Sequence, residues 1–289
     1  MVKSMHLHQI GAHLLGFSLA LASNSVLAQK LQVIGWIPAY GVDKSMQVLQ
    51  SNPHIPAGLT RIGLQFWNPS VDGKSVVLAP TTKNGQPLSP EEVRRVIAWA
   101  KQNHIQVLLT VYNNSQTTNK WDWELAKRAF KNNPKAFGAS LIATMQQFEL
   151  DGIDLDLEGE GNFEEDRASY VKFVKDLSIN LKKYKKLLTI DSFHSPCANA
   201  PNMSWWRDWQ GQVDAIHSMG YQDLYEGSTA SFTPENKPVC EGGAAIFKYS
   251  WQLAYGKNAG YRADQIVMGM PTWLAGWGEG GLGSSISAH

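Results

Sequence analysis

The stretch DGIDLDLE, from Asp151 to Glu158, decides the fold of this chain. Successive side chains of a β-strand point to opposite faces. Two sets of three therefore separate: the apolar Ile153, Leu155 and Leu157 on one face, and the acidic Asp154, Asp156 and Glu158 on the other. The helical patterns on both sides of this stretch favour a central strand covered by helices over a solvated edge strand.

Six further segments have the pattern of short strands. They are residues 31–40, 61–68, 105–112, 186–193, 213–221 and 265–273. Helical periodicity fills residues 89–104, where Ser89 precedes Pro90 and Glu92 in the arrangement of a capping box. Strands that alternate with helices predict a parallel sheet with crossover helices. The other helical segments are residues 132–150 and 162–184.

The first 28 residues have the pattern of a secretory signal. Lys3 precedes an apolar stretch, and Val26 and Ala28 are placed for cleavage after Ala28. The apolar run from Leu14 to Leu21 is far shorter than the roughly 20 residues that a membrane-spanning helix needs. We therefore expect residues 1–28 to be removed and the rest to be secreted or periplasmic, with no membrane contact after cleavage.

Residues 29–289 are close in number to the roughly 250 that a TIM (β/α)8 barrel needs, and no linker or repeat divides them. The sequence thus predicts one domain of the α/β class, a TIM barrel. The strand patterns stop one short of eight, because the segment LAGWGEGGLGSSISAH after Trp273 is too short for another helix and strand. Either an earlier strand is missed, or the chain ends before its barrel closes.

The charge balance excludes the partners that electrostatics would recruit. Lys and Arg total 26 against 25 Asp and Glu, which gives a formal net charge of +1. Neither nucleic acid nor an anionic membrane is expected, and we expect a monomer with a neutral partner. Export would place Cys197 and Cys240, the two cysteines, in an oxidising compartment, where a disulfide is the expected state and a reactive thiol the alternative.

Three carboxylates on the inner face of a barrel strand repel one another and lose hydration. At least one of them should hold a proton at neutral pH, and a raised carboxyl pKa is what a general acid needs. A divalent cation and a purely structural role are the alternatives. The chain has neither EF-hand spacing nor a His-rich ligand set, so we expect no metal ion and no cofactor.

Asp151, Asp154, Asp156 and Glu158, with the residues between them, resemble the DxxDxDxE signature of glycoside hydrolase family 18. Three further segments are similar to the first, sixth and seventh strands of that family: VIGWIPAYG, IHSMGYQD and IVMGMPTWLAGW. The resemblance implies retaining hydrolysis of β-1,4-linked N-acetylglucosamine polymers such as chitin and chito-oligosaccharides. In this family the acetamido oxygen of the substrate is the nucleophile.

The resemblance also implies the catalytic roles. Glu158 would protonate the departing glycosidic oxygen, and Asp156 would orient the acetamido group and stabilise the cationic intermediate. Asp154 would share a proton with Asp156, and Tyr221 would bind the acetamido group from the opposite wall. Asp151 stands at the strand entry, far from the end where barrel chemistry occurs, and a structural role is open for it.

Aromatic side chains near strand ends are candidates to stack on sugar rings. The predicted substrate-binding residues are Trp36, Trp67, Met219, Gln222, Asp223 and Trp273. The chain departs from the family where Tyr112, Asn113 and Asn114 replace a Gly-rich S-x-G-G segment, and where Gln222 replaces the common Asp or Asn. Two alternatives are an endo-β-N-acetylglucosaminidase that acts on N-glycans and a non-catalytic lectin. The intact Asp156 and Glu158 favour an enzyme.

Overall fold

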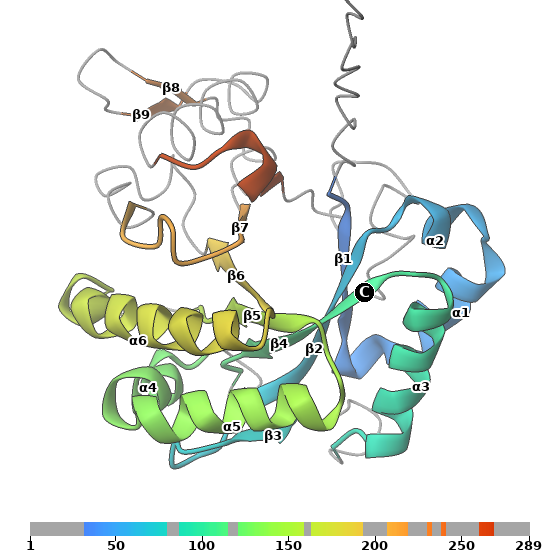
Figure 1. Cartoon of the computed structure of the whole chain (residues 1–289), viewed down its shortest axis with the longest axis horizontal. Helices are drawn as coiled ribbons and strands as arrows, with labels where there is room; N and C mark the ends of the chain where they lie inside the picture. Colours follow the sequence, from blue (N-terminus) through green and yellow to red (C-terminus); the bar gives the residue numbers. More distant parts are fainter. Residues whose placement is uncertain are drawn as a thin grey trace, which may run out of the picture. The chain divides into compact units, whose positions relative to one another are not determined.

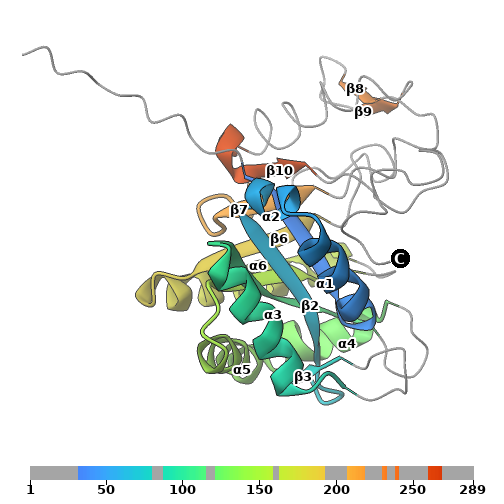
Figure 2. The same cartoon turned by 90° about the vertical axis from the view of Figure 1, so that its right-hand side faces the viewer.

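The computed structural model in Figures 1 and 2 describes eight stretches of the chain. They are residues 32–79, 87–114, 121–158, 163–192, 207–218, 230–232, 238–240 and 260–268. The predicted signal sequence, residues 1–28, lies outside them. Within these stretches, no helix has both the length and the apolar character that a membrane crossing requires.

Seven parallel strands form one sheet in chain order, β1-β2-β4-β5-β6-β7-β10. They are β1 (Ile34–Pro38), β2 (Arg61–Pro69), β4 (Gln106–Tyr112), β5 (Gly152–Asp156), β6 (Leu187–Ser192), β7 (Ala215–Ser218) and β10 (Ile266–Met268). Each falls within or overlaps a predicted strand, so the predicted parallel sheet is confirmed. An eighth parallel strand after residue 268 would lie outside the described residues, so that question stays open.

Three short strands were not predicted from the sequence. Strand β3 (Val76–Leu78) pairs antiparallel with β2, and β8 (Ala230–Phe232) pairs antiparallel with β9 (Pro238–Cys240). Cys240 ends β9, whereas Cys197 lies outside the described residues, so the predicted disulfide is not tested.

Helices follow most of the parallel strands, and several pack on the sheet (Figures 1 and 2). They are α1 (Val42–Ser51), α2 (His54–Gly58), α3 (Pro90–Gln102), α4 (Trp123–Lys127), α5 (Pro134–Gln147) and α6 (Phe163–Lys183), with a π-helical turn, η2 (Arg128–Asn132), between α4 and α5. The 3-10 turns are η1 (Ala39–Gly41) and η4 (Ala263–Gln265). The predicted capping box of α3 is present, because the Ser89 hydroxyl accepts from the Glu92 amide and the Glu92 carboxylate accepts from the Ser89 amide.

The apolar face of β5 belongs to the core as the alternation predicts. Ile153, Leu155 and Leu157 are fully buried in the same cluster as Leu141 of α5 and Phe173 of α6. Burial of each such side chain contributes roughly 1.5–3 kcal/mol, which fixes the opposite face of β5 toward the inside of the sheet.

Trp36 shows that the inner face is strongly curved. Its ring, from β1, meets the ring of His217, from β7, edge to face with centroids 5.1 Å apart. Strands β1 and β7 are separated by four strands in the sheet order, so their side chains meet only because the sheet curls. Gly63 of β2 leaves the room for this crossing, since a Cβ there would lie 2.7 Å from both Trp36 Cδ1 and Thr110 Oγ1.

We expect Gly63→Ala to lower the free energy of unfolding by about 1–3 kcal/mol, because the added methyl displaces two buried side chains. The control is Gly58→Ala, where an added Cβ meets nothing within 4 Å. That change should leave stability unchanged or raise it by up to about 1 kcal/mol. Urea unfolding of both variants measures the difference, and equal effects would contradict the proposed crowding.

Candidate active site

Asp154 is a buried carboxylate with four hydrogen-bond donors from four different strands. Oδ2 accepts from Trp36 Nε1 and Thr110 Oγ1, each at 3.0 Å. Oδ1 accepts from Thr189 Oγ1 at 2.5 Å and lies 3.1 Å from His217 Nδ1. Burial alone would raise the pKa of Asp154, but the charge of His217 and these hydrogen bonds hold it below its ordinary value. Asp154 is therefore ionised.

The strand register brings these side chains together. Thr110 of β4 stands opposite Asp154 of β5, which in turn stands opposite Thr189 of β6. Two residues further along β6, Asp191 stands opposite His217 of β7. Residues opposite one another in neighbouring strands point to the same face, so the inner face collects all five side chains.

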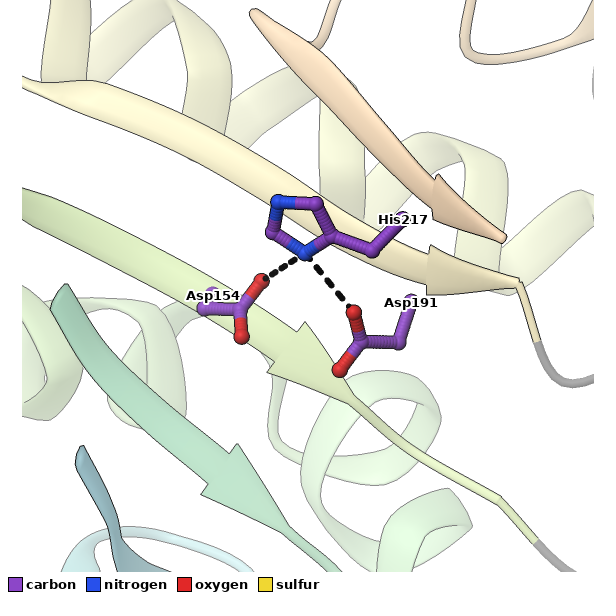
Figure 3. Close-up of side chains that lie close together, drawn as sticks. All are labelled: Asp154, Asp191 and His217. Carbon is purple, nitrogen blue, oxygen red and sulfur yellow. Dashed lines mark hydrogen bonds and ion pairs between the residues drawn. The ribbon is translucent and has the colours of Figure 1, made fainter. Parts of the chain in front are cut away.

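His217 lies between two carboxyl groups (Figure 3). Its Nδ1 is 3.1 Å from Asp154 Oδ1 and 2.8 Å from Asp191 Oδ1. Burial lowers the pKa of His217, but the two carboxyl groups outweigh it and raise the value to about 9. Burial and the charge of Asp154 raise the pKa of Asp191 well above its usual range. The cluster thus pairs an imidazolium with the Asp154 carboxylate.

The sequence prediction missed both His217 and Asp191. Asp191 follows Thr189 at the strand period of two, within the apolar segment LLTIDS, and this pattern marks a polar inner face.

Asp154, Asp191 and His217 each offer one oxygen or nitrogen atom that could bind a metal ion, and these atoms lie within 4.8 Å of one another. A metal ion would need a deprotonated Nδ1, yet Nδ1 faces two carboxyl groups, an arrangement that suits a shared proton.

Besides the cluster of Asp154, Asp191 and His217, the site contains the carboxyl groups of Asp156 and Glu158. The buried Asp156 accepts from Gln65 Nε2 at 2.7 Å through Oδ2. Within the described residues Oδ1 of Asp156 has no hydrogen-bond partner, while the half-buried carboxyl of Glu158 is a hydrogen-bonding neighbour of the Asp156 carboxyl group. Two carboxyl groups bond to each other only when one carries a proton.

Burial raises the pKa of Asp156 to about 6, although the hydrogen bonds from Glu158 and Gln65 act in the opposite direction. Burial and the charge of Asp156 raise the pKa of Glu158 well above its usual range. The two carboxyl groups titrate as a coupled pair, and burial favours the protonated form of each.

The predicted shared proton between Asp154 and Asp156 is not what the hydrogen bonds show. Asp154 is occupied by donors from β1, β4, β6 and β7. Asp156 accepts from Gln65 and has Glu158 as its neighbouring carboxyl group instead. The physical reason is that a carboxylate with four donors has no need of a neighbour's proton.

The structural role considered for Asp151 agrees with its contacts. Its Oδ2 accepts from the Val107 amide at 2.8 Å, and its own amide donates to the Val107 carbonyl at 2.8 Å. Both bonds join β4 to the chain just before β5, away from the carboxyl end of the sheet.

The residues predicted to contact the substrate divide into three groups. Trp36 lies in the site, where it donates to Asp154. Trp67 is 1% exposed and packs against Phe66 and Phe148, which places its ring in the core and gives no support to a role in sugar stacking. The remaining candidates, Tyr221, Met219, Gln222, Asp223 and Trp273, lie outside the described residues.

Other aromatic side chains stand near Asp156. Tyr112 is opposite Asp156 in the register, and its ring meets the 41% exposed Trp121 edge to face at 6.1 Å. Burial, helped by the charges of Asp156 and Tyr40, raises the pKa of Tyr112 to about 12. Tyr40 and Trp121 were not among the predicted residues. Tyr40 ends the predicted strand of residues 31–40 but was not singled out, and Trp121 lies outside every predicted strand.

Comparisons with known proteins agree with this geometry. Residues 32–284 match the model of the family named Glycosyl hydrolases family 18. The chain belongs to this family. A chitinase from Chromobacterium violaceum superposes with a TM-score of 0.62 at 17% identity, over 84% of this chain and 68% of that one. A chitinase from Bacteroides thetaiotaomicron gives a TM-score of 0.58 at 22% identity, over the same two shares.

A third neighbour was solved in complex with NAG4. A variant of the class V chitinase from Nicotiana tobaccum, solved in complex with NAG4, gives a TM-score of 0.58 at 17% identity, over 84% of this chain and 67% of that one. Likeness at these identities establishes the fold, so the predicted TIM-barrel class is confirmed, with the described sheet as a curled part of that barrel.

We expect Asp156→Asn to be more stable than the wild type at pH 8 by about 1–3 kcal/mol. The folded-state pKa of about 6 lies above that of an unfolded Asp, so ionisation destabilises the folded protein progressively as pH rises above 4. The gain should therefore fall toward zero at pH 4, where both side chains are neutral.

Urea unfolding at pH 4, 6 and 8 measures this trend. The exposed Asp176→Asn is the control and should show a smaller effect of opposite sign, because it removes only a solvent-exposed ion pair with Lys172. An Asp156→Asn protein no more stable than the wild type at pH 8 would show that the Asp156 carboxylate is not destabilised by burial.

Proposed function

We propose that this protein hydrolyses β-1,4 bonds of N-acetylglucosamine polymers, chitin or chito-oligosaccharides, with retention of configuration. The observation that carries the proposal is the pair of carboxyl groups of Asp156 and Glu158 at the carboxyl end of β5, where burial raises the pKa of both. Chemistry in TIM barrels takes place at this end. Membership of family 18 and a fold relative in complex with NAG4 support the substrate class.

In the proposed reaction the acetamido oxygen of the substrate attacks the anomeric carbon while Glu158 transfers its proton to the departing glycosidic oxygen. The C–O bond to the leaving sugar breaks, and a cationic oxazolinium forms. The Asp156 carboxylate orients the acetamido N–H and stabilises the positive charge. Water then attacks the anomeric carbon, the bond between that carbon and the acetamido oxygen breaks, and a proton of the water passes to Glu158, which restores the acetamido group and the enzyme.

The charge arrangement supports these roles. Burial and the charge of Asp156 raise the pKa of Glu158 well above its usual range, which favours the protonated form that a general acid requires. Asp156 is ionised above pH 6 and needs no structural change to meet a developing cation. His217 pairs with Asp154, and its charge partly offsets the effect of Asp154, which raises the pKa of Asp156.

The substrate groove is proposed to be lined by Trp36, with Met219, Tyr221, Gln222, Asp223 and Trp273 as further contacts. Tyr40 and Trp121, exposed near Asp156, join them as candidates to stack on sugar rings. We further propose export after removal of residues 1–28, in keeping with a polymeric substrate outside the cytoplasm, and a Cys197–Cys240 disulfide.

We expect the wild-type protein to release fluorophore from chitobioside or chitotrioside substrates. Glu158→Gln should lower the rate at least about 100-fold and keep oligosaccharide binding, because the amide preserves shape but has no acidic proton. Glu149→Gln is the control, an exposed acid paired with Lys101 away from the site.

The outcomes separate the alternatives. A lectin would bind chito-oligosaccharides equally in both forms and release nothing. Release from a glycopeptide with a chitobiose core, and none from chito-oligosaccharides, would identify an endo-β-N-acetylglucosaminidase. Equal rates in the wild type and Glu158→Gln would remove Glu158 from the mechanism.

A further inference from the structure

Glu158 lies just beyond the point where the sheet holds the main chain. Pairing of β5 with β4 ends at Asp156 opposite Tyr112, and pairing with β6 ends at Leu155 opposite Ile190. The amide and carbonyl of Glu158 therefore have no partner in these two ladders. A main chain without such partners leaves the direction of its side chain undefined.

The side chain of Asn113 takes the place of a strand neighbour. Its Oδ1 accepts from the Glu158 amide at 2.7 Å, and its Nδ2 donates to the Glu158 carbonyl. One carboxamide thus binds both main-chain groups of the same residue. The orientation of the amide is unambiguous, because an N–H needs the oxygen and a C=O needs the nitrogen.

Asn113 is itself firmly held. It is fully buried, and its Nδ2 also donates to the Asp122 carbonyl at 2.9 Å, while its own carbonyl accepts from the Asp122 amide at 2.8 Å. Asp122 is the N-cap of α4, whose Leu125 amide it binds at 3.0 Å. The carbonyl of the preceding Tyr112 accepts from Asn68 Nδ2 at 2.5 Å. A side chain fixed on all sides transmits its position to Glu158.

We propose that Asn113 is a positioning residue for the general acid: by binding the amide and the carbonyl of Glu158 it fixes the acid's carboxyl against Asp156. This proposal rests on the proposed function, in which Glu158 is the general acid. Asn113 stands where the family resemblance predicts the Gly-rich S-x-G-G segment, and a glycine has no side chain that makes these bonds. Misplacement of a reacting group by about 1 Å costs on the order of 100-fold in rate.

The first test removes the amide. We expect Asn113→Ala to lower kcat about 100-fold and to change KM less than about threefold, because Asn113 holds the acid and touches no sugar. The matched control is Asn133→Ala, which removes an amide that donates to two carbonyls, of Asp72 and Arg128, outside the site. The control should keep wild-type kcat.

Asn113→Asp provides a rescue that a purely structural role does not predict. A neutral carboxyl has an acceptor and an O–H donor, the pattern of the amide, whereas an ionised one has no donor for the Glu158 carbonyl. The kcat of Asn113→Asp relative to wild type should therefore rise at least about tenfold as pH falls and the introduced carboxyl gains its proton. Glu158→Gln shows no such recovery.

A second readout needs no activity at all. In the described residues the acids that face Glu158 are Asp156 of β5 and Asp191 of β6. Loss of the fixed contact with Asp156 should lower the titration midpoint of Glu158 by roughly one pH unit or more. Carboxyl ¹³C NMR measures it, with the Glu158 signal assigned by its absence in Glu158→Gln.

The two failures are distinguishable. An inactive wild type with a Glu158 midpoint that drops in Asn113→Ala would reject the proposed function and retain the positioning role. Wild-type kcat and an unchanged Glu158 midpoint in Asn113→Ala would overturn the positioning role of Asn113. If Asn113→Ala does not fold by circular dichroism, Asn113→Asp decides, and a constant activity ratio across pH would overturn the proposal.

Discussion

Asp154 buries a negative charge on the inner face of the sheet, where removal from water costs several kcal/mol unless hydrogen bonds replace the lost hydration. The donors come from Trp36, Thr110, Thr189 and His217 on four other strands. Each donor reaches Asp154 only in one strand register, because a slip of one residue turns the side chain to the other face. The interactions that make the site thus also select the register of the sheet, and the hydrogen bond from Trp36 to Asp154 forms across its curved inner face.

The buried charges separate into two groups with different tasks. His217 neutralises Asp154, and the elevated pKa of Asp191 lets that residue keep a proton beside them. Asp156 and Glu158 are left to share one proton at the carboxyl end of β5. This division explains why three carboxyl groups at the strand period of two can coexist on one face: one is paired with a cation, one is ionised and one is neutral.

The seven parallel strands and the capped α3 were predictable because their signals are local, a period of two and a Ser89–Glu92 box. The acidic face of DGIDLDLE was predictable for the same reason. Trp67 shows the limit, since the same strand position can end in the groove or in the core, and only the packing of Phe66 and Phe148 decides. Asp191 and His217 needed the register of β6 with β7, which no local pattern contains.

Asn113 shows how a residue just beyond the end of a sheet can be held in place. A residue inside the ladder has both main-chain groups bound, but its side chain is surrounded by its neighbours' side chains; a residue beyond the ladder is open to a substrate but has lost its partners. Glu158 is half-buried and lies two residues after β5, so its amide and carbonyl have lost their partners in the sheet. A buried carboxamide from the adjacent strand restores both hydrogen bonds without adding a strand that would cover the acid. Glu158 is therefore accessible because it lies beyond the end of β5, and its main chain is held in place by Asn113.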